Sequence, residues 1–207
     1  MTKQHGSLAP LSQEEWLSRY YLIRAAFSAM WVAAAITVGQ QSWTLGVILL
    51  VAYPAWDALA NCIDASHSGG LSRNPTQMFN VIVSAATALV VTLALTVSMN
   101  WVLAVFGVWA ILSGLLQLGT AVRRWKSYGA QWAMVLSGGQ SALAGTIFIV
   151  QAQSPMVPSI TGIAGYAAIG ALYFAVSGIW VNGASHPRAS TFAETLDARP
   201  PRAAIGM

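Results

Sequence analysis

The sequence predicts an all-α membrane protein with six transmembrane helices, and three observations support this fold class. Of the 207 residues, 56% are hydrophobic and only 8% are charged, whereas a water-soluble domain carries about a quarter charged residues. The apolar residues lie in long continuous runs, without alternating or amphipathic patterns. The runs reach the roughly 20 residues that a helix needs to cross the hydrocarbon core. They are too long for the roughly ten-residue strands of a membrane barrel, so helices are expected.

Six apolar runs define the expected helices in order along the chain: residues 20–39, 43–63, 77–98, 100–121, 131–150 and 159–181. No small-residue cleavage pattern follows the first run, so we expect it to serve as an uncleaved signal anchor. The chain then divides into an N-terminal cytoplasmic segment, 1–18, and a transmembrane domain, 19–182. Residues 183–207 are polar and rich in Pro and Ala, and we expect a disordered cytoplasmic tail.

The charges predict the orientation of the helices. If the six runs span, all ten basic residues fall on one side of the membrane: Lys3, Arg19, Arg24, Arg73, Arg123, Arg124, Lys126, Arg188, Arg199 and Arg202. The loops on the other side, residues 40–42, 98–100 and 151–158, carry no charge. Cytoplasmic loops collect Lys and Arg, so both termini are expected in the cytoplasm.

An internal repeat is visible when the even-numbered helices are aligned. Residues 53–59, 109–115 and 173–179 share an aromatic residue, three positions, a small polar group, a small residue and then Leu or Ile. This alignment places Asp57 over two serines, Ser113 and Ser177. The odd-numbered helices carry a weaker match at Ser28, Ser84 and Ser137. The repeat predicts three tandem helical hairpins in one bundle.

Small residues four positions apart form stripes along several of the expected helices. Examples are Ala25, Ala29 and Ala33 on the first helix, and Ser137, Ser141 and Gly145 on the fifth. Helices in lipid associate through close backbone approach, so such stripes predict the seams of a packed bundle. The alternative is that the small residues line a permeation path.

Asp57 places a carboxylate within the second apolar run, where a charge costs about 2.5–3.5 kcal/mol at the centre of a membrane helix. Counted back from residue 63, it lies about 9 Å inside the cytoplasmic boundary. Arg24 lies about one turn inside the same boundary on the neighbouring helix. Opposite charges at similar depth are expected to pair, so an Arg24–Asp57 ion pair is the preferred hypothesis. Asn61 is on the same helix face as Asp57 and could hydrogen-bond the carboxylate.

An alternative hypothesis makes Asp57 a working proton site or cation ligand. Pro54 lacks a backbone N–H and is expected to kink the helix just before Asp57. A kink beside a buried acid occurs in transporters, but proline is also common in passive membrane helices. The sequence leaves both roles of Asp57 open.

Other chemistry is sparse. Arg123, Arg124, Trp125 and Lys126 form a cationic and aromatic turn that predicts an interfacial anchor in the headgroup region. The three histidines fall outside the apolar runs, and no spacing of His, Cys, Asp and Glu indicates a metal site. No nucleotide loop or catalytic motif is present, so neither a cofactor nor an enzyme is expected. The net charge of +4 belongs to turns that face lipid headgroups, so nucleic acid is not an expected partner.

The chain resembles the HdeD-like family of small bacterial inner-membrane proteins. The resemblance lies in the six helices, in "WVLAVFGVWAILSGLLQL" followed by "AVRRWKSYGAQWAMVLSGGQSALAG", and in "GYAAIGALYFAVSGIW". It covers residues 18 to 181 and implies a role in acid resistance, with no catalytic residues to assign. We therefore expect a non-enzymatic, stress-related membrane protein that acts through packing in the bilayer, as a homo-oligomer or with another membrane protein. The alternative is a small proton- or ion-linked transporter or channel that uses Asp57.

Overall fold

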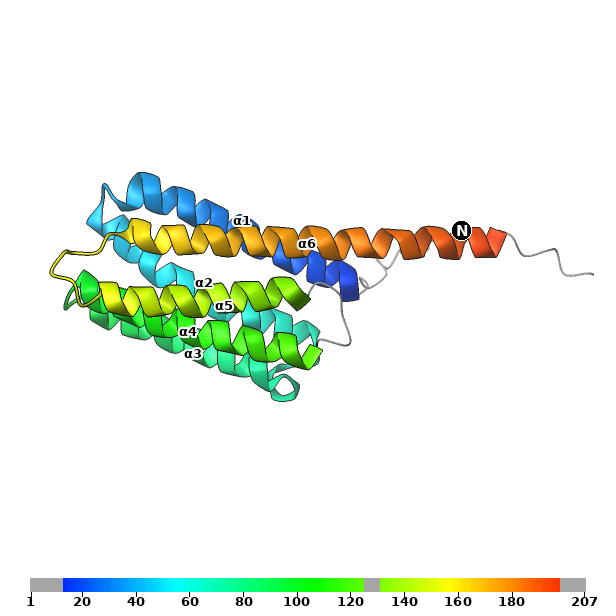
Figure 1. The fold of residues 1–207 in the computed structure, drawn as a ribbon, viewed down its shortest axis with the longest axis horizontal. Coiled ribbons are helices and arrows are strands. Elements are labelled where there is room, and N and C mark those ends of the chain that lie inside the picture. Colours follow the sequence, from blue (N-terminus) through cyan, green and yellow to red (C-terminus); the bar gives the residue numbers. More distant parts are fainter. Residues whose placement is uncertain (1–12, 125–130, 198–207) are drawn as a thin grey trace, which may run out of the picture.

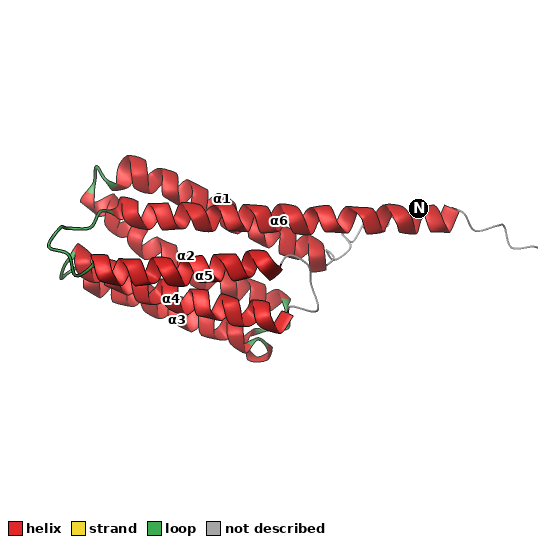
Figure 2. Cartoon of the chain, viewed as in Figure 1, coloured by secondary structure: helices red, strands yellow, loops and turns green. Residues whose placement is uncertain are grey.

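The computed structural model describes residues 13–124 and 131–197, and side chains for residues 15–119, 121, 122 and 135–182. This part of the chain is helical and contains no strand (Figure 2). The six α-helices are α1 (Gln13–Ala34), α2 (Trp43–His67), α3 (Pro75–Ala94), α4 (Met99–Arg124), α5 (Gln131–Gln151) and α6 (Ile160–Asp197). One π-helical turn, Ala35–Gly39, extends α1, and a 3-10 turn, Leu71–Arg73, precedes α3.

Five of the helices are long and apolar enough to cross a membrane, within Glu15–Gly39, Trp43–His67, Pro75–Ala94, Met99–Gly119 and Ile160–Asn182. In α5 the described apolar stretch, Val135–Gln151, is shorter than a full span. Large apolar side chains cover the outside of the bundle, among them Leu89, Leu93 and Leu172, whose exposed fractions are 70%, 67% and 64%. Such a surface suits lipid and not water. The chain is therefore a multi-pass membrane protein, and five of the six expected spans are long and apolar enough to cross.

Two helices extend well beyond the apolar runs that predict them. α1 begins at Gln13 and not near residue 20, and α6 continues to Asp197. Figure 1 shows α6 projecting past the ends of the other helices. Residues 183–197, part of the segment for which disorder is expected, belong to α6 in the structure. A helix satisfies its own backbone groups through i to i−4 hydrogen bonds, so it need not stop where the hydrocarbon ends.

The connections between helices are closed by hydrogen bonds. After α2, the N–H of Gly70 donates to the carbonyl of Ala65 at 2.8 Å, with Gly70 at φ +91°, a conformation that glycine adopts without strain. At the opposite end, the Asn100 amide donates to the carbonyls of Ala152 and Ser154 at 3.1 and 2.9 Å. This amide fastens the start of α4 to the α5–α6 connection.

The closest helix pairs are α4 with α5, α1 with α6, and α2 with α3. α1 contacts α2 only slightly, and α5 contacts α6 little more. The expected tandem hairpins are therefore not confirmed as packing units. Glycines allow the closest approach: a Cβ added at Gly114 would lie 2.5 Å from the carbonyl oxygen of Gly138. Close backbone contact is the usual basis of helix association in lipid, and here it joins α4 to α5.

The interior of the bundle has two layers. The layer nearest the 98–100 and 152–159 connections is apolar, and its buried side chains include Trp31, Leu50, Val91, Val102, Phe106, Phe148 and Ile163. The layer toward the start of α1 holds the buried polar side chains Ser18, Ser28, Asp57, Asn61, Gln77, Ser84 and Ser141. The polar layer is the place to look for a functional site.

Candidate functional site: a buried ion pair beside two polar cavities

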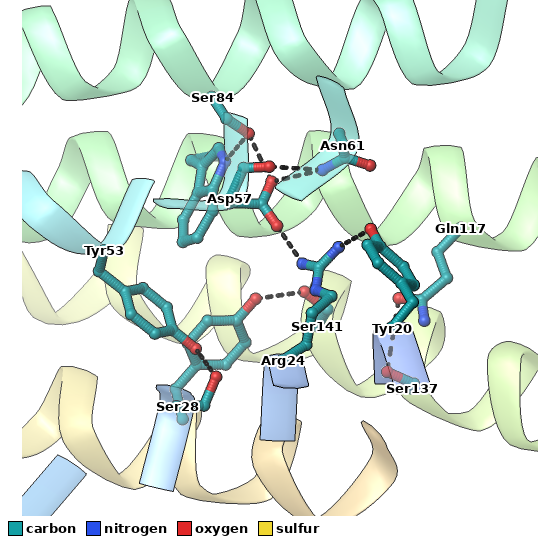
Figure 3. Close-up of polar contacts among 12 residues, drawn as sticks. Tyr20, Arg24, Ser28, Tyr53, Asp57, Asn61, Ser84, Gln117, Ser137 and Ser141 are labelled. Carbon is teal, nitrogen blue, oxygen red and sulfur yellow. Dashed lines mark hydrogen bonds and ion pairs between the residues drawn. The ribbon is translucent and has the colours of Figure 1, made fainter. Parts of the chain in front are cut away.

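The centre of the polar layer is an ion pair between α1 and α2. The Arg24 Nη2 group donates to Asp57 Oδ1 (Figure 3). The exposed fractions of the two side chains are 14% and 12%. The structure thus brings together the two charges that the sequence places at similar depth. A pair this poorly exposed is stable only if its remaining donors and acceptors are also satisfied.

The second oxygen of Asp57 is held by two further side chains. Ser84 on α3 donates its hydroxyl to Asp57 Oδ2 at 2.7 Å. The Asn61 amide donates to the same oxygen at 3.1 Å and to the Asp57 carbonyl at 2.8 Å. Both carboxylate oxygens are therefore engaged, one by a cation and one by two neutral donors. This is the environment of a charged carboxylate with a fixed counterion.

Arg24 makes contacts in two other directions. Its Nη1 group donates to the Tyr20 hydroxyl at 2.8 Å, one turn earlier on α1. The guanidinium lies over the ring of Phe174 on α6, 4.3 Å from the ring centroid. A cation over an aromatic face is attracted by about 0.5–2 kcal/mol. Arg24 and Asp57 thus connect α1, α2, α3 and α6.

Three hydrogen bonds around the ion pair share one sequence spacing. Each joins a serine on an odd-numbered helix to an aromatic side chain on the next helix, 25 residues later, and the pairs are Ser28–Tyr53 at 3.4 Å, Ser84–Trp109 at 3.0 Å and Ser141–Tyr166 at 2.7 Å. Successive serines are 56 (84 − 28) and 57 (141 − 84) residues apart, as are the aromatic residues. Equal spacing in three places supports an internal repeat.

This spacing changes the register expected for the third unit. The sequence alignment sets Ser177 opposite Asp57, whereas an offset of 57 residues from Ser113 leads to Gly170. Because α6 carries similar small-residue patterns two turns apart, the sequence match alone selected the wrong turn. In the same register, Asn80 and Ser137 take the place of Arg24. The ion pair is therefore a feature of the first unit alone.

Two adjoining cavities surround the ion pair. The larger has a volume of about 140 Å³ and is lined by polar groups that include Asn61, Asp64, Gln77 and Tyr173. The smaller has a volume of about 80 Å³ and extends among Tyr53, Trp56, Trp109 and Tyr166. Six residues line both: Arg24, Asp57, Ser113, Gln117, Ser137 and Phe174. A polar hollow thus lies within the membrane domain, next to its buried charges.

Two buried donors at the smaller cavity have no hydrogen-bond partner among the described residues. They are the Trp56 indole Nε1 and the Ser113 hydroxyl. Buried polar atoms without a partner are uncommon in native proteins and ask for a specific explanation. The indole N–H can only donate, so any partner of Trp56 Nε1 has to be an acceptor.

Pro54 lies in the interior of α2 and is buried. α2 nevertheless runs as one helix from Trp43 to His67. The kink that the sequence predicts at Pro54 stays a prediction. Pro54 precedes Asp57 by three residues, nearly one helical turn.

The expected interfacial anchor lies outside the described residues. The side chains of Arg123 and Arg124 are not described, and Trp125 and Lys126 fall in the gap between α4 and α5. Cys62 is half-buried. Among the described residues, no group of three or more His, Cys, Asp or Glu side chains could hold a metal ion.

Four members of the network were not predicted to lie beside the ion pair: Tyr20, Ser84, Trp109 and Phe174. Ser84 is expected only as a weak repeat match to Ser28, although its offset of 56 residues from Ser28 equals that of Trp109 from Tyr53. That pair of equal offsets was a usable signal. Nothing in the sequence marks Phe174 as a neighbour of Arg24, because the contact depends on how α6 packs against α1.

Comparisons of this chain with family models, with curated proteins and with solved structures give no match.

Proposed function

We propose that this multi-pass membrane protein acts without enzymatic chemistry, as a stress-related protein of the bacterial inner membrane with both termini in the cytoplasm. The observation that carries the proposal is the environment of Asp57. Arg24 occupies one oxygen, and Asn61 and Ser84 occupy the other. A carboxylate held in this way neutralises Arg24 and fastens helices together. Its partners are the lipid bilayer and either a second copy of this chain or another membrane protein.

The acid-related part of the proposal comes from the resemblance to HdeD-like proteins. Hydrogen bonds to both oxygens of Asp57 tie α1, α2 and α3 together in the polar layer. A role under acid stress requires this packing to persist as the medium becomes acidic. We propose that this persistence is what the protein contributes under acid stress.

Transport is the second candidate function, and the two cavities favour it. They bring polar lining to Asp57 from the end of the bundle near the α2–α3 connection, while the apolar layer closes the other end. A polar hollow closed on one side is typical of a transporter in one of its states. In this candidate Asp57 exchanges a proton or binds an ion, and Arg24 moves away to allow it.

One set of variants separates the two candidates: wild type, Asp57→Asn, Arg24→Gln and the double variant. Each is reconstituted into vesicles for proton flux and expressed in cells for acid survival. A packing role predicts flux no greater than in protein-free vesicles. It also predicts poorer survival and accumulation for Asp57→Asn than for the double variant, because the single change strands Arg24. Flux that is present in wild type and absent in a folded Asp57→Asn protein would overturn the packing role in favour of transport.

A further inference from the structure

Several hydrogen-bond donors at the smaller cavity have no acceptor among the described residues. Trp56 Nε1 and the Ser113 hydroxyl are buried there without a partner. The guanidinium of Arg24, which has five N–H groups, uses only two of them in its bonds to Tyr20 and Asp57. An unmet buried donor costs about 1–3 kcal/mol. The cavity is therefore incomplete without a group that brings acceptors.

The acceptors of Asp57, Ser141 and Tyr166, which line the smaller cavity beside Arg24, are engaged. Both oxygens of Asp57 receive hydrogen bonds, and the hydroxyls of Ser141 and Tyr166 bond to each other at 2.7 Å. A cation would need free acceptors and would face the guanidinium of Arg24. The chemistry that complements the site is an acceptor-rich group, and a carboxylate matches the fork of Arg24 better than any single oxygen does.

The size and walls of the cavities narrow the ligand further. Volumes of about 80 and 140 Å³ exceed the roughly 10–15 Å³ of such space that one water needs. The rings of Trp109 and Phe174 form apolar wall beside the donors. Asp64 lines the larger cavity, so its charge opposes a ligand that carries a second carboxylate. Short monocarboxylates meet all of these conditions.

We propose that the paired cavities form a binding site for a small monocarboxylate. The carboxylate oxygens accept hydrogen bonds from Trp56 Nε1 and from the Ser113 hydroxyl. They also accept from the N–H groups of Arg24 that are not bonded to Asp57 or Tyr20. Its short apolar end lies against Trp109 or Phe174. Asp57 remains bonded to Arg24 in the bound state, so the guanidinium bridges two carboxylates. The proposal does not depend on the packing role or on transport, because binding at equilibrium needs neither.

Titration calorimetry of the purified full chain in detergent, with sodium acetate as the probe, tests this site. Acetate should bind saturably to wild type, and Trp56→Phe and Ser113→Ala should each weaken binding by about tenfold or more, the effect of losing one hydrogen bond to a charged group. Thr146→Ala is the matched control, because this exposed hydroxyl on α5 bonds only to the Ala142 carbonyl of its own helix. Its affinity should equal that of wild type.

Acetamide and sodium chloride at matched concentration distinguish a carboxylate site from simpler alternatives. Acetamide has the shape of acetate without its negative charge. Chloride has the negative charge without the two oxygens of a carboxylate. The proposal predicts that both bind at least about tenfold more weakly than acetate. It is overturned if folded wild type shows no saturable heat with acetate, which would leave water as the only occupant. It is equally overturned if acetamide or chloride binds as well as acetate, or if both donor variants keep wild-type affinity.

Discussion

The α4–α5 seam offers a pair of adjacent glycines that differ only in what they face. Gly138 is buried against α4, and a Cβ added there would lie 2.7 Å from the Gly114 carbonyl oxygen and 2.9 Å from Leu118 Cγ. Gly139, one residue later, faces open space, with nothing within 4 Å of its added Cβ. Ordinary contact begins at 3.4 Å, so Gly138→Ala forces α4 and α5 apart by about 0.7 Å (3.4 − 2.7) at this level.

The difference in stability between Gly138→Ala and Gly139→Ala measures the cost of moving α4 and α5 apart. Both changes gain the same helix preference of Ala over Gly, about 1 kcal/mol, and this term cancels in the difference. Forcing apart a packed seam costs about 1–3 kcal/mol, partly because a gap of 0.5–1 Å forfeits a quarter to a half of each dispersion contact. We therefore expect Gly138→Ala to be less stable than Gly139→Ala by about 1–3 kcal/mol.

Thermal unfolding in one detergent, followed by circular dichroism, measures the difference. For a chain of this length each kcal/mol lowers Tm by about 2–4 °C, so the two variants should differ by several degrees. Equal Tm values would show that α4 and α5 do not approach at Gly138, and the seam would be refuted. A Gly139→Ala variant less stable than Gly138→Ala would indicate that the opposite face of α5 is the packed one.

Two further predictions concern the network and the orientation. Ser84→Ala removes a donor to Asp57 and leaves the Trp109 N–H without its acceptor. It should therefore lower the free energy of unfolding by about 1–3 kcal/mol. Thr92→Ser, on the lipid-facing side of α3, is the control and should leave the free energy of unfolding nearly unchanged. A cysteine introduced at position 72 should react with a membrane-impermeant maleimide only from the cytoplasmic side, and one at position 154 only from the outer side, once the native cysteine is replaced. Destabilisation by Thr92→Ser equal to that by Ser84→Ala, or labelling of both cysteines from one side, would contradict these expectations.

The membrane helices could be predicted because lipid makes the signal simple. A spanning helix must be apolar over most of its length, and the runs beginning at residues 43 and 131 match the starts of α2 and α5. The ends were less predictable, since polar residues at the membrane surface allow a helix to continue or to stop. The start of α1 at Gln13 and the continuation of α6 to Asp197 belong to this class.

The sequence predicts the candidate site only in part, from the depth of the charged residues below the membrane boundary. Depth alone placed Arg24 beside Asp57, because both charges lie near one boundary on consecutive helices. The contacts from α3 and α6 depend on the rotation and order of helices around the bundle, which apolar sequences specify weakly. α1 packs closely against α6 and only slightly against α2, so Phe174 lies under Arg24 while the tandem hairpins are not the packing units.

The repeat illustrates how structure corrects a sequence match. Short motifs of small and apolar residues recur along α6, and one of them, at residues 173–179, has the expected pattern in the wrong turn. Three hydrogen bonds with a common spacing of 25 residues select the other register, in which Tyr166 corresponds to Tyr53 and Trp109. Hydrogen-bonded pairs carry this information because each fixes two helices at once.

The central claim is that Arg24 and Asp57 exist to neutralise each other within the bundle. A double-mutant cycle on the free energy of unfolding, measured in bicelles for wild type, Asp57→Asn, Arg24→Gln and both changes together, tests it directly. Each single change strands a buried partner and should cost about 3–5 kcal/mol. The account predicts that the double variant is more stable than Asp57→Asn alone, with a coupling energy of at least about 2 kcal/mol. Single-variant effects that add to within about 0.5 kcal/mol would contradict it.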